Sequence, residues 1–154
     1  MHLTVRSNHA MRLMMYCAMK RGQIAPVSEI ARACNMSEAH LAKIANRLAT
    51  AGFVQTVRGR AGGVRLAQAP EDIRVGDVVR TTEMGICLIE CLDLDTNTCP
   101  LVTACKLRGV VQRALRAFLA VLDDCTLADL IDDGDDLRAL MGLGADTPMP
   151  GPGA

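Results

Sequence analysis

Three cysteines, Cys91, Cys99 and Cys105, lie within the stretch CLDLDTNTCPLVTACKL, with seven residues in the first gap and five in the second. Cysteine thiolates bind soft or borderline metals, namely zinc, copper(I) and the irons of iron–sulfur clusters. Structural zinc sites usually contain cysteine pairs about two to four residues apart. The wider gaps here favour a cluster, which is larger than a single ion. A zinc site and unligated buried thiols stay open as alternatives.

The other four cysteines have apolar neighbours. Cys17, Cys34 and Cys125 fall in apolar helical patterns, and a free cysteine behaves as a small hydrophobic residue. We therefore expect these three in the core. Cys87 lies four residues before Cys91 and could supply a fourth ligand, but its surroundings, MGICLIEC, favour a buried thiol.

The composition and the first residues indicate the cellular compartment. The chain has 154 residues and seven cysteines, and an odd number argues against a closed disulfide framework. The first residues, MHLTVRSNHAMR, lack the apolar stretch of a signal peptide. No run reaches the roughly 18 uncharged apolar residues that a membrane span needs. We predict a cytoplasmic protein without a membrane span, in which thiols stay reduced.

The net charge of zero hides two halves of opposite sign. Residues 1–70 contain ten basic and two acidic residues, a net charge of +8, and the remainder carries seven basic and fifteen acidic residues, a net charge of −8. A cationic half joined to an anionic half suggests that the first half meets a polyanion. A solvated basic surface is the plainer alternative.

The elements that would position these groups can be predicted from periodicity. Apolar residues spaced by three and four predict a helix over 5–20. Ser28 is the expected N-cap of a short helix over 28–34, and Ser37 that of a third helix to about Ala51. Gly52 should end this third helix as its C′ residue.

A hairpin is predicted after the third helix, over 53–67, because two β-prone runs flank GRAGG, whose glycines permit a positive φ. A short helix follows from about Val75, then a long helix over 106–124. Residues 126–131 should form a short helix capped by Thr126. The fold expected is mainly α with a small β-hairpin wing: a winged helix-turn-helix domain plus a long dimerisation helix.

A helix-turn-helix followed by a glycine-tipped basic hairpin is typical of DNA-binding winged helices. A polar, basic helix face can read base edges in the major groove, and an extended arginine suits a narrow minor groove. The predicted DNA-binding residues are Ser28, Ser37, Glu38, His40, Lys43 and Arg47 on the helices, and Arg58, Arg60, Gly62 and Gly63 in the wing.

The long helix predicts a partner subunit. Leu107, Val111, Ala114, Phe118 and Val121 step by four and three residues, as in a coiled-coil seam. Further apolar positions flank this seam, so the helix must be covered from more than one side. A homodimer is the simplest cover. We thus predict three parts: a DNA-binding domain over 1–70, a cysteine loop and dimerisation helix over 71–131, and a disordered tail over 132–154.

Over residues 1–131 the chain resembles a known family, the dimeric winged-helix iron–sulfur transcription regulators. This family includes the iron–sulfur cluster regulator IscR, the nitric-oxide sensor NsrR and the rhizobial iron regulator RirA. The resemblance rests on the winged helix, the C-x7-C-x5-C spacing, the long helix and a TL-DL segment. The stretches HAMRLMMYCA, VQTVRGRAGGVRL, DVVRTTE and CPLVTACKL are most similar to the rhizobial iron regulator.

The resemblance implies a homodimer on palindromic double-stranded DNA operators, with one iron–sulfur cluster, [4Fe-4S] or [2Fe-2S], per subunit. It assigns the cluster to Cys91, Cys99 and Cys105, the recognition helix to about 37–49, and the wing arginine to Arg58.

The fourth cluster ligand differs within the family that the chain resembles. In the nitric-oxide sensor it is an aspartate near the N-terminus of the partner subunit. The matching position here is Asn8, with His9 beside it, and a carboxamide is a poorer iron ligand than a carboxylate. A histidine just after the third cysteine serves in the iron–sulfur cluster regulator, but Lys106 follows here. Asn8 or His9 of the partner subunit, water or a small thiol could complete the site.

The function expected is that of an iron-responsive DNA-binding repressor whose operator affinity depends on the cluster. A nitric-oxide or redox sensor with the same cysteines is one alternative, and a zinc-stabilised DNA-binding protein is another. The sequence contains no phosphate loop and no nucleophile motif with its supporting residues, so an enzyme is not expected.

Overall fold

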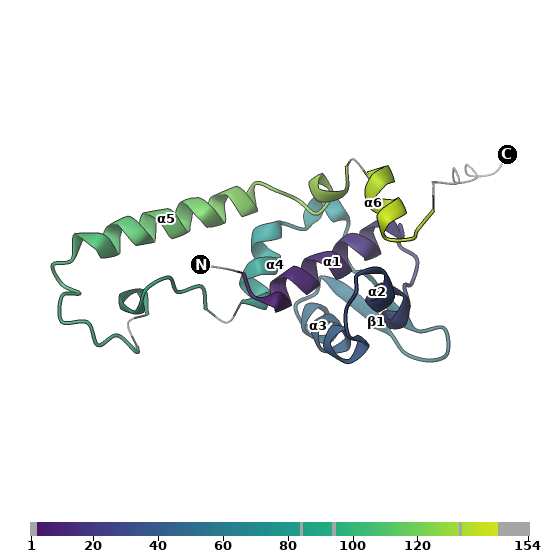
Figure 1. Cartoon of the computed structure of the whole chain (residues 1–154), viewed down its shortest axis with the longest axis horizontal. Helices are drawn as coiled ribbons and strands as arrows, with labels where there is room; N and C mark the ends of the chain where they lie inside the picture. Colours follow the sequence, from purple (N-terminus) through teal and green to yellow (C-terminus); the bar gives the residue numbers. More distant parts are fainter. Residues whose placement is uncertain (1–2, 84, 94, 133, 145–154) are drawn as a thin grey trace.

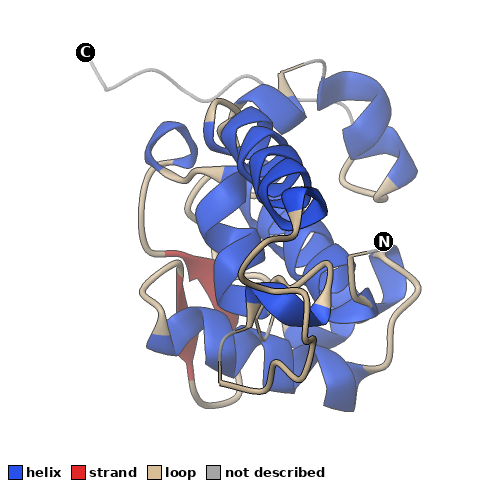
Figure 2. Ribbon diagram, turned by 90° about the vertical axis from the view of Figure 1, so that its left-hand side faces the viewer, coloured by secondary structure: helices blue, strands red, loops and turns tan. Residues whose placement is uncertain are grey.

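The computed structural model describes residues 3–83, 85–93, 95–132 and 134–144 (Figure 1). Most of these residues are helical, and two short strands lie at one side of the molecule (Figure 2). In chain order the elements are α1 (Val5–Met19), α2 (Val27–Ala33), α3 (Glu38–Thr50), β1 (Val54–Val57), β2 (Gly63–Leu66), the 3₁₀ helix η1 (Pro70–Asp72), α4 (Val75–Thr82), η2 (Glu90–Leu92), α5 (Lys106–Asp123), η3 (Asp129–Ile131) and α6 (Gly134–Leu140).

Helix α1 is the centre of the hydrophobic core. Its buried side chains pack with the apolar stripe of α3, formed by Leu41, Ile44 and Leu48. Because apolar residues recur every three or four positions in both helices, each helix turns one continuous face inward. Burying a Leu or Ile side chain stabilises the fold by roughly 1.5–3 kcal/mol. This packing fixes α3 on the surface of the core with its polar face outward.

Strands β1 and β2 form an antiparallel hairpin, in which Val54 pairs with Leu66 and Val57 with Gly63. The hairpin is tied to the α1–α2 connection, because Ala25 and Val64 exchange two backbone hydrogen bonds of 2.8 Å. A Cβ atom on Gly63 would lie 2.2 Å from the Ala25 carbonyl oxygen. Gly63 therefore permits the close approach that anchors the wing.

The glycines of the predicted hairpin tip have different tasks. Gly59 has a φ of +109°, as the prediction of a positive φ requires. Gly62 and Gly63 do not share that conformation. A Cβ on Gly62 would lie 2.3 Å from the Val57 carbonyl oxygen, so this glycine, like Gly63, is needed for close approach of the backbone.

Helix α5 runs along one edge of the molecule, beyond α4 and away from α3 (Figure 1). None of its 18 residues, all of them described, is fully buried. Leu107, Val110 and Val121 have exposed fractions of 60%, 49% and 69%. Residues 85–105, here called the cysteine segment, connect α4 to the N-terminal end of α5.

Most predicted elements are confirmed. The helices predicted over 5–20, 37–51 and 106–124, and the one from Val75, appear within two residues of their predicted bounds, and Gly52 follows α3 with a φ of +81°. The Thr126 hydroxyl accepts a hydrogen bond from the Asp129 backbone N–H at 3.2 Å, but only 129–131 are helical, in η3, and the N-cap residue there is Ala128, so the helix predicted over 126–131 with Thr126 as its cap is only partly confirmed. No helix in the described part of the chain is long and apolar enough to cross a membrane.

Two further predictions about these elements are wrong. Ser28 is not an N-cap, because α2 begins at Val27 and Pro26 occupies the capping position. The φ of −58° fixed by the Pro26 ring suits the entry to a helix. Disorder from residue 132 is also wrong for 134–140, which form α6. The Arg138 guanidinium of α6 donates to the Met19 carbonyl oxygen at 2.7 Å. The remaining predicted tail, 145–154, lies outside the described residues.

Candidate functional site

Helix α3 presents a polar face next to the buried stripe described above. Ser37 occupies the N-cap position with extended backbone, but its side chain makes no capping hydrogen bond within the described part of the chain. Glu38, His40, Lys43 and Arg47 are all exposed. The predicted recognition helix therefore has the amphipathic form that major-groove binding needs: an apolar face held by the core and a polar face directed outward.

Arg47 has a second contact that its sequence position does not suggest. Its Nε–H donates a hydrogen bond of 2.7 Å to the Thr81 carbonyl oxygen, in the last turn of α4. The C-terminal end of a helix carries a partial negative charge, which favours a guanidinium there. Arg47 thus joins the polar face of α3 to α4.

His40 contacts His9 of α1, and the two rings meet edge to face with centroids 5.3 Å apart. Burial, the neighbouring His40 and the charge of Arg12 together lower the pKa of His9. The His9 Nδ1 atom is buried and has no hydrogen-bond partner among the described residues. His9 therefore lies beside the predicted recognition helix of its own chain, whereas Asn8, the other predicted ligand, is exposed.

The wing carries its arginines on the outside. Arg58 and Arg60 are exposed in the connection between β1 and β2. Arg65 lies opposite Gln55 in the hairpin, and its guanidinium donates two hydrogen bonds, of 3.0 and 2.9 Å, to the Gln55 side-chain oxygen. Ser28 is exposed on α2. Arg58 and Arg60 are thus exposed at the tip of the hairpin, whereas the Arg65 guanidinium is partly engaged within it.

The cysteine segment holds the three candidate ligands in different local settings. Cys91 is buried in η2, which packs against α5; Cys99 and Cys105 are half-buried, and Cys105 is the N-cap residue of α5. All seven cysteines are free thiols. In this conformation the described residues bring no three Cys, His, Asp or Glu side chains together as a metal site. The donor set fits a thiolate-bound cluster or zinc in kind.

Local hydrogen bonds determine the path of the cysteine segment. Asp93 accepts hydrogen bonds from the Asp95 backbone N–H, at 3.1 Å, and from the Thr96 hydroxyl, at 2.9 Å. The Asn97 side-chain oxygen accepts one from the Cys99 backbone N–H, also at 3.1 Å. Such short-range turns are formed without long-range packing. The loop around Cys99 is therefore held by these local hydrogen bonds.

The burial of the remaining four cysteines can be compared with the predictions made for them. Cys17 and Cys34 are buried as expected, and burial raises the pKa of Cys17 to about 12. Cys125 is only half-buried. The prediction of a buried Cys87 is wrong: this thiol is exposed, and it donates to the Ile89 carbonyl oxygen at 2.9 Å. The apolar residues around Cys87 lie in irregular chain, where no helix or strand turns them toward the core.

Two polar clusters attach α4 to its neighbours, and no local sequence pattern predicts either of them. The first is at the C-terminal end of α4. The Glu83 carboxylate accepts hydrogen bonds from the Thr4 backbone N–H at 2.8 Å, from the Thr4 hydroxyl at 3.0 Å, and from the Ser7 hydroxyl. Burial opposes ionisation of Glu83, but these hydrogen bonds outweigh it and lower its pKa. Glu83 thereby anchors the start of α1.

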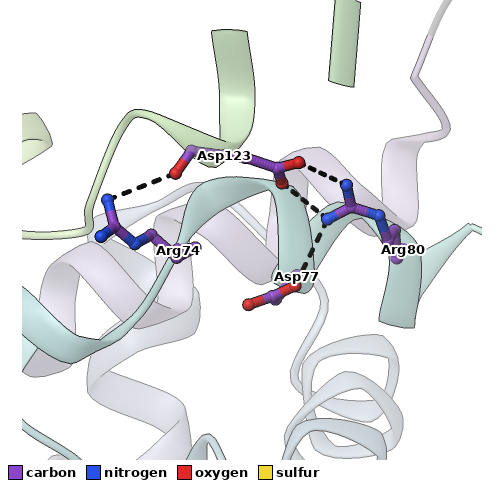
Figure 3. Close-up of polar contacts among 4 residues, drawn as sticks. All are labelled: Arg74, Asp77, Arg80 and Asp123. Atoms are coloured by element: carbon purple, nitrogen blue, oxygen red, sulfur yellow. Dashed lines mark hydrogen bonds and ion pairs between the residues drawn. The ribbon is translucent and has the colours of Figure 1, made fainter. Parts of the chain in front are cut away.

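The second cluster attaches α4 to the end of α5 (Figure 3). The Arg80 guanidinium binds both Asp123 carboxylate oxygens at 2.6 Å, and it reaches Asp77 at 3.3 Å. The Arg74 guanidinium donates to the Asp123 carbonyl oxygen at 3.3 Å. Helix α4 is thus connected to α1, α3 and α5, and so links the predicted recognition helix to the predicted dimerisation helix.

Comparisons with known proteins agree with a winged-helix regulator. Residues 3–133 match the Rrf2 family model, described as "Iron-dependent Transcriptional regulator". The chain is 42% identical over 144 residues to the HTH-type transcriptional regulator NsrR of Halalkalibacterium halodurans, covering 93% of this chain and 99% of that protein.

Two solved structures are similar in fold. The T. potens IscR structure gives a TM-score of 0.69 at 26% identity over 90% of this chain and 91% of that one. CymR, the global cysteine regulator of B. subtilis, gives 0.67 at 28% identity over 88% of this chain and 99% of that one. These relatives are regulators and not enzymes. With its winged helix and its matched family model, the chain belongs to the Rrf2 family of DNA-binding transcriptional regulators.

Proposed function

We propose that this protein is an iron-responsive repressor whose operator affinity depends on an iron–sulfur cluster bound by Cys91, Cys99 and Cys105. The observation that carries the proposal is the position of three free thiols on the one segment that connects α4 to α5. The description of the matched family as iron-dependent supports iron as the signal. The cluster would be bound only when iron is available, so its occupancy would follow the iron supply.

The proposed DNA target is a palindromic double-stranded operator. His40, Lys43 and Arg47 lie exposed on α3, and Ser37 and Glu38 stand at its leading end, where recognition helices contact base edges. Arg58 and Arg60 would reach the backbone or the minor groove from the wing. The positive charge of residues 1–70 would attract the phosphates at long range.

The proposed homodimer forms through α5. The apolar side chains of this helix stay largely exposed in one chain, and a second copy would cover them. A two-fold dimer would place two recognition helices on successive half-sites of the operator. The family resemblance implies that the dimer also brings the start of α1 near the cysteine segment of the partner, and of the two predicted fourth ligands the exposed Asn8 is freer to reach it than His9.

Cluster occupancy would act on DNA binding by linkage. A group that binds only one conformation of the cysteine segment stabilises that conformation in proportion to its occupancy. If that conformation also favours operator binding, loss of the group lowers the operator affinity. Iron scarcity would then release the repressor from its DNA.

Anaerobic purification tests the proposal directly. Visible absorption, iron and sulfide content, and native mass spectrometry should show a cluster in the dimer. Operator binding should weaken when a chelator removes the cluster. Zinc with no visible absorption would instead identify a zinc-stabilised DNA-binding protein, and a metal-free protein that binds its operator unchanged would exclude a metal-dependent switch.

A second candidate signal is nitric oxide. The relatives named NsrR support it, because NsrR is the nitric-oxide sensor within the family that the sequence resembles. Anaerobic titration of the loaded protein with nitric oxide separates the two signals. Loss of operator binding at about stoichiometric nitric oxide, with no response to chelator, would favour this second candidate over iron.

A further inference from the structure

The last turn of α4 is held by the recognition helix and by α1 at adjacent carbonyl groups. The Arg47 Nε–H of α3 donates to the Thr81 carbonyl oxygen at 2.7 Å. Arg6 of α1 donates from its guanidinium to the Thr82 carbonyl oxygen at 3.3 Å. The buried hydroxyls of Ser7 and Thr82 share a hydrogen bond of 2.7 Å. This turn therefore has fixed contacts with both α1 and α3.

The same turn leads directly into the cysteine segment. Glu83 is the C-cap residue of α4, and residue 85 begins the segment that carries Cys91. The part of the segment next to Glu83 is therefore only a few residues from the Thr81 and Thr82 carbonyl groups. At the other side, the Arg80–Asp123 ion pair links α4 to the end of α5 (Figure 3).

Arg47 can hold α4 and bind DNA at once. The contact with Thr81 uses only its Nε–H, and its two Nη groups make no hydrogen bond or ion pair within the described part of the chain. The side chain is exposed on the same helix as Lys43. A guanidinium has five donors in a fixed plane, so fixing Nε also fixes the direction in which the Nη groups point.

We propose that Arg47 is the positioning residue through which the cysteine segment controls the recognition helix. The inference rests on the proposed function, and it identifies the contact that carries the regulation. When the segment holds the end of α4 in the present position, Thr81 orients the Arg47 guanidinium for an operator phosphate. When the segment moves, Arg47 loses its carbonyl partner and its preferred direction. Because coupling is reciprocal, operator binding should in turn favour the position of the cysteine segment that favours operator binding, and hydrogen exchange in the segment should then slow.

The test compares wild type with Arg47→Lys and with Lys43→Ala as a matched control on the same helix. Lysine keeps the charge of Arg47 but cannot reproduce the fixed fork. The probe is the duplex that wild-type protein selects from a random DNA pool. Its Kd is measured for cluster-loaded and chelator-treated protein, and hydrogen exchange of residues 85–105 is measured with and without the duplex.

The expected wild-type result is an affinity at least about fivefold higher for loaded than for cluster-free protein, within the usual range of allosteric coupling. Arg47→Lys should bring this ratio to within about twofold of one and remove the exchange response to DNA. Lys43→Ala should weaken both forms equally, so that the ratio and the exchange response persist. A ratio and an exchange response in Arg47→Lys equal to those of wild type would overturn the inference.

The exchange measurement separates failure of the inference from failure of the proposed function. If loaded and cluster-free wild-type protein bind the operator with equal affinity, the proposed function is wrong. The hydrogen-exchange data from cluster-free protein then test the role of Arg47 by themselves. A DNA-induced exchange change in residues 85–105 that is present in wild type and lost in Arg47→Lys supports the inference. No such change in wild type, or the same change in both proteins, overturns it.

Discussion

Arg80 and Asp123 form a bidentate ion pair that joins α4 to the last residue of α5, and both guanidinium–carboxylate distances are 2.6 Å. The geometry depends on a glycine, because a Cβ on Gly76 would lie 1.8 Å from the Asp123 Oδ1 atom. The carboxylate thus occupies the space that any side chain at position 76 would need. Two helices on either side of the cysteine segment are held together at this point.

Replacement of Gly76 tests this ion pair. Gly76→Ala should lower the free energy of unfolding, because the methyl group displaces the Asp123 carboxylate from Arg80. Gly109→Ala is the control: its Cβ would meet nothing within 4 Å in α5, and alanine favours a helix over glycine by up to about 1 kcal/mol. Urea unfolding followed by circular dichroism measures both variants. Gly76→Ala as stable as Gly109→Ala would show that the ion pair is dispensable.

Glu83 should make the stability of the protein depend on acid pH. The hydrogen bonds from Ser7 and Thr4 lower the folded-state pKa of Glu83, while in the unfolded chain it titrates at about 4.3. Its stabilising effect is therefore complete above the unfolded pKa and is lost as pH falls through the lower folded pKa. Urea midpoints measured from about pH 6 down to pH 3 should fall less steeply in Glu83→Gln than in wild type. Glu71→Gln, at an exposed position in η1, should follow the wild-type curve.

The wing should bind DNA through Arg58 more than through Arg65. Arg58→Ala should weaken operator binding by roughly 1–3 kcal/mol if this exposed side chain reads a base edge or a narrow groove. Arg65→Ala should cost less, because the Arg65 guanidinium is bonded to Gln55. Fluorescence anisotropy over a range of salt concentrations measures both. Equal losses in the two variants would contradict this assignment of roles within the wing.

Each of the three cysteines of the segment should be needed for the cluster but not for the fold. Cys91→Ala, Cys99→Ala and Cys105→Ala should each abolish stable iron and sulfide loading, because a cluster with two thiolates has lost a main part of its ligand set. Far-ultraviolet circular dichroism should stay unchanged. Cys125→Ala, at a half-buried thiol outside the segment, should load normally. Full iron and sulfide in all three variants would exclude these residues as ligands.

Asn8 should set the lability of the cluster. Three thiolates leave one iron without a cysteine ligand, and that iron should be the first that a chelator removes. Asn8→Asp would offer the partner's cluster a carboxylate, a better ligand for iron than a carboxamide. Anaerobic decay of the cluster absorbance under chelator should be slower in Asn8→Asp than in wild type or Asn8→Ala. Identical decay in all three would mean that position 8 does not reach the cluster.

The sequence by itself determined the elements and the family. The apolar spacing of Leu41, Ile44 and Leu48 predicted α3 and its buried face, and the glycines around Gly59 predicted the hairpin. These features depend on residues close in the sequence, because helix periodicity and turn conformation are local properties. The cysteine spacing and the basic half of the chain are equally local, so the DNA-binding and cluster hypotheses could be formed before the fold was known.

Only the tertiary structure decided which polar groups meet. Arg47 and Thr81 are 34 residues apart, Arg80 and Asp123 are 43 apart, and Ser7 and Thr82 are 75 apart. No periodic pattern links such pairs, because their distance depends on how the helices pack. For the same reason the exposure of Cys87 and the packing of α6 were not predicted. Both depend on which surfaces the core leaves free, and the packing of the whole chain decides that.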